Sequence, residues 1–189
     1  MLTQILALLL GTAANLLTVA FLARLYAQWV RAPFRNPVGQ FILALTDWAV
    51  LPLRRFIPGL FGTDLASLIA AWIVQIAYYG LMAGLTGLLS AVSAETVLTV
   101  AWVAGVTTVR MLVYLLIGVV IIAALLSWIN PYSPLTPFFD QLSRPLLAPV
   151  RRRMPALGGI DLSPLVVLLL LEVVLIVLAN LMPGRFLLS

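Results

Sequence analysis

Four apolar runs constrain the fold of this chain more than any other feature of its sequence. They cover residues 5–30, 65–88, 96–129 and 162–182. Each reaches the length of about 20 residues that an α-helix needs to cross the hydrocarbon core of a bilayer. Because 63% of the residues are apolar and 9% are charged, the chain lacks the charged surface of a soluble domain. The sequence predicts an all-α membrane protein.

The third run is longer than one crossing and shorter than two, and it contains Arg110. We take residues 111–129 as the third crossing, which makes four transmembrane helices in total. Residues 94–108 then form a separate segment that lies at the interface, enters as a half-span or is buried against the bundle.

A repeat divides the chain into two similar units. The stretch PLRRFIPGLFGTDL, which begins at residue 52, returns as PVRRRMPALGGIDL at residue 149, after 97 residues. Each unit is a span, a loop with an amphipathic helix, and a second span. Since each unit has two crossings, the two run parallel through the membrane. We assign residues 1–90 to the first repeat, 91–110 to a connecting segment and 111–189 to the second repeat.

The loop of each repeat has the features of an interfacial helix. Asn36 and Ser133 are suitable N-caps, and a proline follows each of them at the first helical position. Apolar residues then recur at helical spacing, which predicts an amphipathic helix of about 14 residues in the headgroup plane. Pro52 and Pro149 are expected to end these helices, and Pro145 is expected to kink or interrupt the second one.

An arginine cluster follows each loop helix. The candidates for binding lipid or a partner protein are Arg54, Arg55, Arg151, Arg152 and Arg153. A guanidinium presents a planar fork that matches phosphate, and each basic residue near an anionic leaflet contributes roughly 1 kcal/mol. The simpler interpretation is that these arginines determine topology and contact headgroups. The further one is that they recognise a specific lipid or a protein.

Asp64 and Asp161 stand at the entrance to the second and fourth spans. Each can cap the helix that follows it, or pair with the arginines to form a repeated clamp. Asp47 and Arg144 occupy equivalent positions with opposite charges, so a bridge between the halves is a third possibility.

Arginine placement predicts the orientation. Eight of the eleven basic residues fall within residues 31–63 and 130–161. By the positive-inside rule both arginine-rich loops are cytoplasmic, which places both chain ends on the periplasmic side.

The residue types that the chain lacks exclude most catalytic and metal-binding sites. The chain has no cysteine, histidine or lysine, so it cannot build a thiolate nucleophile, a histidine-ligated metal or haem, a Ser-His triad or a Schiff-base lysine. We expect no enzymatic activity, no cofactor and no metal. The net charge of +5 comes without a basic stripe interleaved with aromatics, which argues against nucleic acid and favours anionic phospholipid.

Glu172 is the most unusual polar residue within the spans. It lies eleven residues past Asp161, roughly 16 Å deeper along a helix and near the middle of a core about 30 Å thick. One interpretation is an ion or proton relay with Arg24 or Asn180. The other is a hydrogen-bonded carboxyl that holds helices together. Gln75 is its counterpart in the first repeat.

The second span carries small residues at Gly80 and Gly84, a spacing that permits close helix contact within the chain or in a homo-oligomer.

At its repeated motifs the chain resembles the YggT family. The motifs are an Asn-Pro type helix start, a P-x-R-R segment and a G-x-D-L entry into an apolar span, found at residues 36–37, 52–55 and 62–65 and again at 133–134, 149–152 and 159–162. The resemblance implies an inner-membrane or thylakoid protein. Relatives are linked to osmotic or ion homeostasis, to organisation of the envelope or nucleoid during division, and to maturation of a membrane cytochrome.

Two hypotheses for function remain. The first is a non-enzymatic inner-membrane protein that organises or helps to assemble other components, and binds anionic phospholipid and membrane-protein partners through its arginine-bearing loops. The alternative is a small channel or transporter for ion or osmotic homeostasis, with Glu172 on its path.

Overall fold

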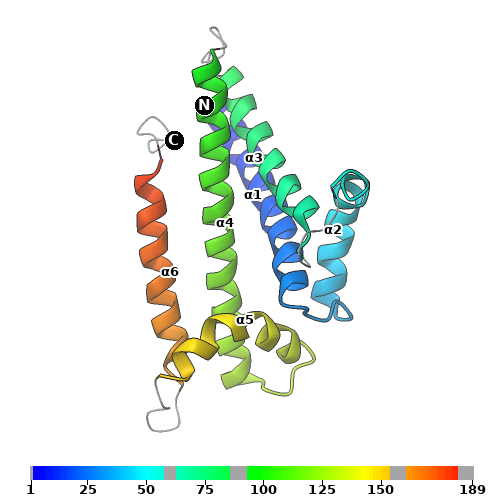
Figure 1. The fold of residues 1–189 in the computed structure, drawn as a ribbon, viewed down its shortest axis with the longest axis vertical. Coiled ribbons are helices and arrows are strands. Elements are labelled where there is room, and N and C mark those ends of the chain that lie inside the picture. The colour runs from blue at the N-terminus through cyan, green and yellow to red at the C-terminus, as the bar shows by residue number, and fades with distance from the viewer. Residues whose placement is uncertain (1, 58–62, 86–92, 154–160, 183–189) are drawn as a thin grey trace.

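Six α-helices make up the part of the chain that the structure describes. The computed structural model describes residues 2–57, 63–85, 93–153 and 161–182. The helices are α1 (Leu2–Trp29), α2 (Pro37–Leu53), α3 (Leu65–Leu85), α4 (Ala94–Ile129), α5 (Thr136–Arg151) and α6 (Ser163–Asn180). Helices α1, α3, α4 and α6 are long and apolar enough to cross a membrane, as predicted. Figure 1 shows α4 standing between the α1–α3 pair and α6.

Helix α4 differs from the sequence prediction. It is one continuous helix of 36 residues, about 54 Å long at 1.5 Å per residue, whereas we expected a separate segment over residues 94–108. The physical reason is that residues 94–129 contain no proline, so every backbone N–H can continue the helix. Arg110 lies inside it and its guanidinium reaches Tyr114 Oη at 3.5 Å. Ser93 is the N-cap of this helix, and its Oγ accepts a hydrogen bond from the Thr96 amide.

Each repeat has its own apolar core. In the first half, α1, α2 and α3 meet at a cluster that contains Phe21, Val50 and Ala71. In the second half, α4, α5 and α6 meet at a smaller cluster of Val120, Leu147 and Val167. The parallel arrangement of the repeats therefore places α4 where α1 stands in the first half, α5 where α2 stands and α6 where α3 stands.

A third apolar cluster joins the two halves. It brings Tyr26 of α1 and Phe138 of α5 together with residues of α2 and α4. Two hydrogen bonds cross the same junction. Tyr26 Oη donates to the Leu142 carbonyl at 2.7 Å, and Gln141 Nε2 donates to the Val30 carbonyl at 2.8 Å. Helix α5 thus connects the C-terminal end of α1 to the second repeat.

The start of α2 follows the sequence prediction. Asn36 Oδ1 accepts a hydrogen bond from the Gly39 amide at 2.9 Å, and the Asn36 carbonyl accepts one from the Gln40 amide at 3.0 Å. Gly39 has a further role that the pattern did not reveal. A Cβ atom there would lie 2.7 Å from Phe34 Cα, so only glycine allows the incoming chain to pass this close.

The predicted N-cap role of Ser133 is wrong. Helix α5 begins at Thr136, with Leu135 in the N-cap position, and Ser133 Oγ accepts a hydrogen bond from the Leu135 amide at 3.3 Å. The reason is Pro137, which has no N–H to donate to the Ser133 carbonyl. In the first repeat the Gln40 amide makes the equivalent bond.

The helix-ending prolines lie slightly inside their helices. Helix α2 ends at Leu53, one residue after Pro52, and α5 ends at Arg151, two residues after Pro149. Pro145 does not interrupt α5, because a proline removes one backbone donor and the flanking turns continue. The turn prolines and glycines that follow each arginine cluster fall outside the described residues.

Helix α1 ends in a Schellman motif whose central residue is Arg31. The Ala32 amide donates to the Ala27 carbonyl at 2.8 Å and the Arg31 amide donates to the Gln28 carbonyl at 3.0 Å. Arg31 has φ = 56°, the left-handed conformation that glycine usually provides at this position. A side chain in this conformation is strained by roughly 1–2 kcal/mol.

We therefore expect Arg31→Gly to stabilise the protein by about 1 kcal/mol, because glycine adopts this φ without steric strain. Thermal unfolding in detergent micelles measures the change. Arg31→Ala is the matched control: it removes the charge and keeps the Cβ, so its midpoint should stay close to that of the parent. Equal stabilisation by both variants would show that the charge, not the backbone, is responsible.

Candidate functional site

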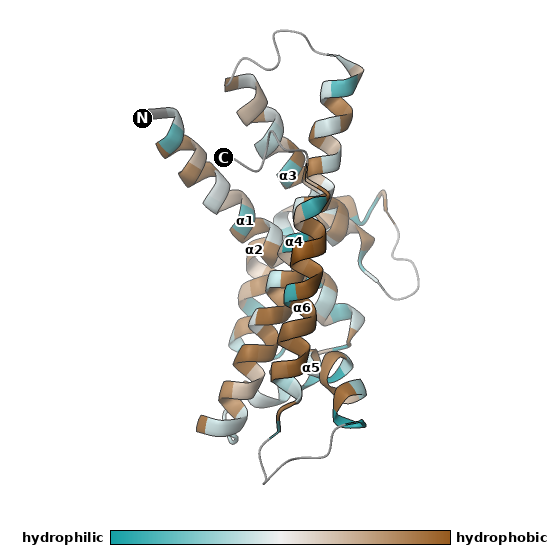
Figure 2. Ribbon diagram, turned by 90° about the vertical axis from the view of Figure 1, so that its left-hand side faces the viewer, coloured by the Kyte–Doolittle hydropathy of each residue, from teal (hydrophilic) through white to brown (hydrophobic). Residues whose placement is uncertain are grey.

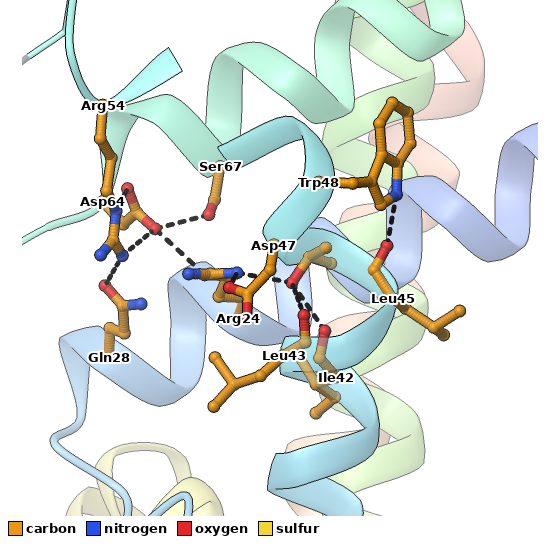
Figure 3. A network of polar contacts seen from close by, with 11 residues as sticks. Arg24, Gln28, Ile42, Leu43, Leu45, Asp47, Trp48, Arg54, Asp64 and Ser67 are labelled. Atoms are coloured by element: carbon orange, nitrogen blue, oxygen red, sulfur yellow. Dashed lines mark hydrogen bonds and ion pairs between the residues drawn. The ribbon is translucent and has the colours of Figure 1, made fainter. Parts of the chain in front are cut away.

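A buried guanidinium organises the first repeat. Arg24 projects from α1 and is only 2% exposed. Its Nη1 donates to Asp47 Oδ1 at 2.7 Å and to Thr46 Oγ1 at 2.8 Å, both on α2. Its Nε lies 3.5 Å from Oδ2 of Asp64, the residue that precedes α3. Figure 3 shows this one side chain connecting three helices.

A second arginine completes the network from the other side of Asp64. Arg54 donates from Nη2 to Asp64 Oδ2 at 2.7 Å and from Nε to Oδ1 at 3.2 Å, a bidentate fork. Arg54 Nη2 also donates to Gln28 Oε1, and Ser67 Oγ donates to Asp64 Oδ2 at 2.6 Å. Two carboxylates thus offset two guanidiniums, so the buried charge is balanced.

The network keeps Asp64 ionised. Burial of this carboxyl by itself raises its pKa, but the hydrogen bonds from Arg54 and Ser67 and the charge of Arg24 outweigh it, so the pKa lies below its ordinary value. The hydrogen bond to Asp64 likewise raises the pKa of Arg54. A carboxyl whose pKa is lowered by folding stabilises the fold above its unfolded pKa, and that contribution is lost as pH falls through the folded value.

The second repeat retains only the outer part of this arrangement. Arg151 Nε donates to Asp161 Oδ2 at 2.7 Å, and Asp161 Oδ1 accepts from the Ser163 amide at 2.9 Å. The side chains of Arg151 and Asp161 are 54% and 37% exposed. Burial by itself raises the pKa of Asp161, but the hydrogen bonds from Ser163 and Arg151 and the charge of Arg151 outweigh it, so the pKa lies below its ordinary value.

The second repeat has an uncharged residue at the position that corresponds to Arg24. When Trp128 is aligned with Trp29, Ala123 falls on Arg24. A small cavity of about 30 Å³ lies beside Ala123, and Ser143 and Asp161 also line it. The exposed ion pair between Arg151 and Asp161 therefore lacks a buried cation beside it, and such a pair contributes at most about 1 kcal/mol. The two halves share the Arg-Asp clamp but differ in the buried cation that anchors it.

The structure divides the five candidate arginines into two groups. Arg54 and Arg151 hold the aspartates of their own repeat. Arg55, Arg152 and Arg153 are exposed, and within the described part of the chain no hydrogen bond or ion pair engages their side chains. These three guanidinium groups are therefore available to ligands outside the chain.

The bridge considered between Asp47 and Arg144 is not formed. Asp47 forms its ion pair with Arg24 instead. Arg144 is exposed beside a groove of about 190 Å³ that Trp29 and Gln141 also line. The signal for the observed pairing was Arg24 itself. A cation inside an apolar span requires a carboxylate within reach, but the sequence does not show which helix folds back to supply it.

Gln75 and Glu172 occupy equivalent repeat positions and have opposite environments. Gln75 is fully buried and its Nε2 donates to Asn15 Oδ1 at 3.1 Å and to Thr18 Oγ1 at 3.0 Å, both on α1. Glu172 is exposed on α6, and no polar partner engages it among the described residues. The suggested contact between Glu172 and Arg24 is not formed.

The small-residue face of α3 is open. A Cβ atom at Gly80 would meet nothing within 4 Å, and Gly84 is exposed. This face remains available for the predicted contact between copies. Among the described residues no group of three or more acidic side chains is placed to hold a metal ion.

Comparisons with known proteins agree with the repeat. A family model described as CCB3/YggT matches residues 3–85 and 102–182. The chain is 35% identical over 167 residues to the uncharacterised protein YggT of Escherichia coli K12, covering 88% of this chain and 85% of the relative. It is 37% identical over 185 residues to an uncharacterised protein of Pseudomonas aeruginosa, covering 91% and 87%. No solved structure matches the chain significantly.

The difference between the repeats predicts unequal effects of the same substitution. Arg24→Gln removes the buried cation from the half-exposed Asp47 and from Asp64, which keeps its bonds to Arg54. Removal of one partner of a buried pair destabilises by about 3–5 kcal/mol, so we expect a loss near the lower end of that range. Arg151→Gln removes an exposed pair and should cost no more than about 1 kcal/mol. Equilibrium unfolding in mixed micelles compares the two. Similar losses in both variants would contradict a central role for Arg24.

The pKa of Asp64 predicts the acid sensitivity of the fold. Stability should hold above pH 4, near the ordinary aspartate pKa of about 3.9, and decline below it as Asp64 becomes protonated in the folded state. Unfolding midpoints between pH 7 and pH 3 test this. Asp64→Asn should be less stable at pH 7 and lose less on acidification than the parent does. An unchanged slope in that variant would assign the acid sensitivity to other carboxyls.

Proposed function

Since the chain belongs to the CCB3/YggT family, we propose that it is a non-enzymatic protein of the bacterial inner membrane that organises or helps to assemble other membrane components. It binds anionic phospholipid and partner proteins through two elbows, residues 54–57 directly after α2 and residues 151–153 at the C-terminal end of α5. The observation that carries the proposal is that, in each arginine cluster, one arginine forms an ion pair with an aspartate and its neighbour is exposed.

Each elbow has one arginine whose ion pair holds the backbone in place, and at least one arginine whose side chain has no partner among the described residues. Arg54 and Arg151 are held by Asp64 and Asp161, so the next residue in each cluster projects from an anchored backbone. An anchored guanidinium loses less conformational freedom when it binds a phosphate than one on a flexible loop does. The bidentate geometry of arginine suits a lipid phosphodiester.

The first elbow also carries an apolar side chain suited to the same surface. Phe56, directly after Arg55, is 84% exposed. At a membrane surface the ring enters the acyl region while the neighbouring guanidinium stays at the level of the phosphates. The positive-inside rule places both elbows in the cytoplasm and both chain ends in the periplasm.

A channel or transporter for ions or osmolytes is the second candidate. One observation favours it: a cavity of about 540 Å³ near the start of α1, lined by Gln4, Thr12, Asn15 and Tyr78. Glu172, the residue we expected on such a path, is exposed on α6 instead. Ion flux in proteoliposomes that is the same with and without the protein would remove this candidate.

Lipid selectivity tests the leading proposal. We expect Arg55→Gln, Arg152→Gln and Arg153→Gln together to lower the preference for phosphatidylglycerol over phosphatidylcholine on the order of 100-fold, because three basic residues at roughly 1 kcal/mol each contribute about 3 kcal/mol at an anionic surface. Native mass spectrometry of the protein with defined lipid mixtures measures the preference. The thermal midpoint of this variant should match that of the parent.

The matched control replaces the other arginine of each cluster. Arg54→Gln with Arg151→Gln breaks both clamps, so it should lower the thermal midpoint while its folded fraction retains most of the lipid preference. If the triple variant keeps its full preference for anionic lipid, the elbows are not the lipid-binding surface and the proposal fails.

A further inference from the structure

Glu172 presents a physical problem that the single chain does not solve. It is the tenth residue of the 18-residue helix α6, close to the middle of a span, and its side chain is exposed. Intramembrane carboxyl groups almost always face a bundle interior or an aqueous cavity, because lipid offers no hydrogen-bond partner. Among the described residues no donor or cation of the same chain reaches it.

In the first repeat the side-chain amide N–H at the equivalent position finds partners inside the chain, while Gln75 Oε1 is buried without a hydrogen-bond partner among the described residues. Gln75 turns inward and bonds Asn15 and Thr18 of α1. In the alignment that places Trp128 on Trp29, the corresponding residues of α4 are Tyr114 and Ile117. Ile117 offers no hydrogen bond, and Tyr114 is already near the Arg110 guanidinium. The second repeat therefore has a stronger polar group at this position and has lost part of the inward partner set.

Glu172 belongs to a regular stripe on the outer surface of α6. The exposed residues Leu165, Leu169, Glu172 and Ile176 follow one another at intervals of four, three and four. This is the heptad seam of a left-handed helix pair, the commonest packing geometry between transmembrane helices. An adjacent side of α6, which carries Val167 and Leu171, packs on α4 and α5. Figure 2 looks onto α6, and the ribbon colours mark most of its residues as hydrophobic.

We propose that this seam is the interface of a parallel homodimer, in which α6 of one copy packs against α6 of a second copy and the two Glu172 carboxyls hydrogen-bond to each other. A two-fold axis along the membrane normal brings every residue of the seam opposite itself at the same depth. A protonated carboxyl donates and an ionised or neutral one accepts, so two copies of this side chain satisfy one another.

The occupant is a second copy because the seam is complementary to itself. Its apolar residues match across a two-fold axis, and the symmetry alone delivers a hydrogen-bonding group to the depth of Glu172. A single polar residue within an apolar seam fixes register and the number of strands. A different protein would have to supply both a matching heptad face and a polar group at that depth. The proposal does not depend on lipid binding at the elbows.

Cysteine cross-linking tests the interface, since the chain has no cysteine of its own. Leu169→Cys and Ile176→Cys place a thiol on the seam, at a position where two copies approach closely enough for a disulfide. Val177→Cys is the matched control, because Val177 is similarly exposed on α6 at nearly the same depth but lies off the stripe. The proteins are oxidised in phosphatidylglycerol–phosphatidylethanolamine liposomes at a high lipid-to-protein ratio.

We expect both seam variants to form covalent dimers and Val177→Cys to remain largely monomeric. Gly84→Cys on α3 tests the alternative interface through the small-residue face. Preferential cross-linking at Gly84, equal cross-linking at Val177 and Ile176, or no dimer from the seam variants would each overturn the proposal.

The role of the carboxyl is tested by two substitutions in the same liposomes. Glu172→Gln keeps a donor and an acceptor, so the dimer fraction measured by energy transfer between labelled copies should be retained. Glu172→Leu should weaken the dimer about 3- to 30-fold, the range expected for an interhelical hydrogen bond in a membrane. Glu172 is exposed in the single chain, so neither substitution should change the stability of the monomer. The thermal midpoint of the monomer in dilute detergent serves as the folding control. A Leu variant that dimerises as well as the parent would remove Glu172 from the interface.

Discussion

The ion pair network around Arg24 is the interaction on which the arrangement of the first repeat depends. A guanidinium buried inside a helix bundle has to be matched by carboxylates, because the cost of leaving it unpaired exceeds what most single contacts contribute. Asp47 and Asp64 come from two different elements, so satisfying Arg24 fixes α2 and the entrance of α3 against α1 at once. Arg54 then ties the elbow to the same carboxylate.

The two repeats use this device to different extents. Both keep an arginine of the elbow paired with the aspartate that precedes the next span. Only the first has the buried cation, and in the second an alanine stands beside a small cavity at that place. The pattern extends into the membrane, where Gln75 turns inward and Glu172 turns outward. In the first half, Arg24 and Gln75 find partners on other elements of the chain, whereas the Glu172 side chain of the second half has none among the described residues.

Sequence patterns predicted the elements well and their connections less well. The four spans, the loop helices and the cap at Asn36 followed from hydropathy and residue chemistry. The start of α5 and the length of α4 did not, because both depend on which backbone N–H groups are present: Pro137 removes one donor, and residues 94–129 lack any proline that would break the helix. The roles of Thr46 and Gln28 had no signal in the sequence, since each is an ordinary polar residue until Arg24 or Arg54 approaches it.

The sequence by itself determined that this is a duplicated, all-helical membrane protein with an arginine cluster and an aspartate in each unit. These features depend on hydropathy, helix periodicity and residue type, which are local properties. Only the tertiary structure decided which charges pair. Arg54 and Arg151 are engaged and Arg55, Arg152 and Arg153 are not, because a salt bridge depends on distances between helices that lie far apart along the chain. The outward position of Glu172 was decided in the same way, by the side of α6 that packs on α4.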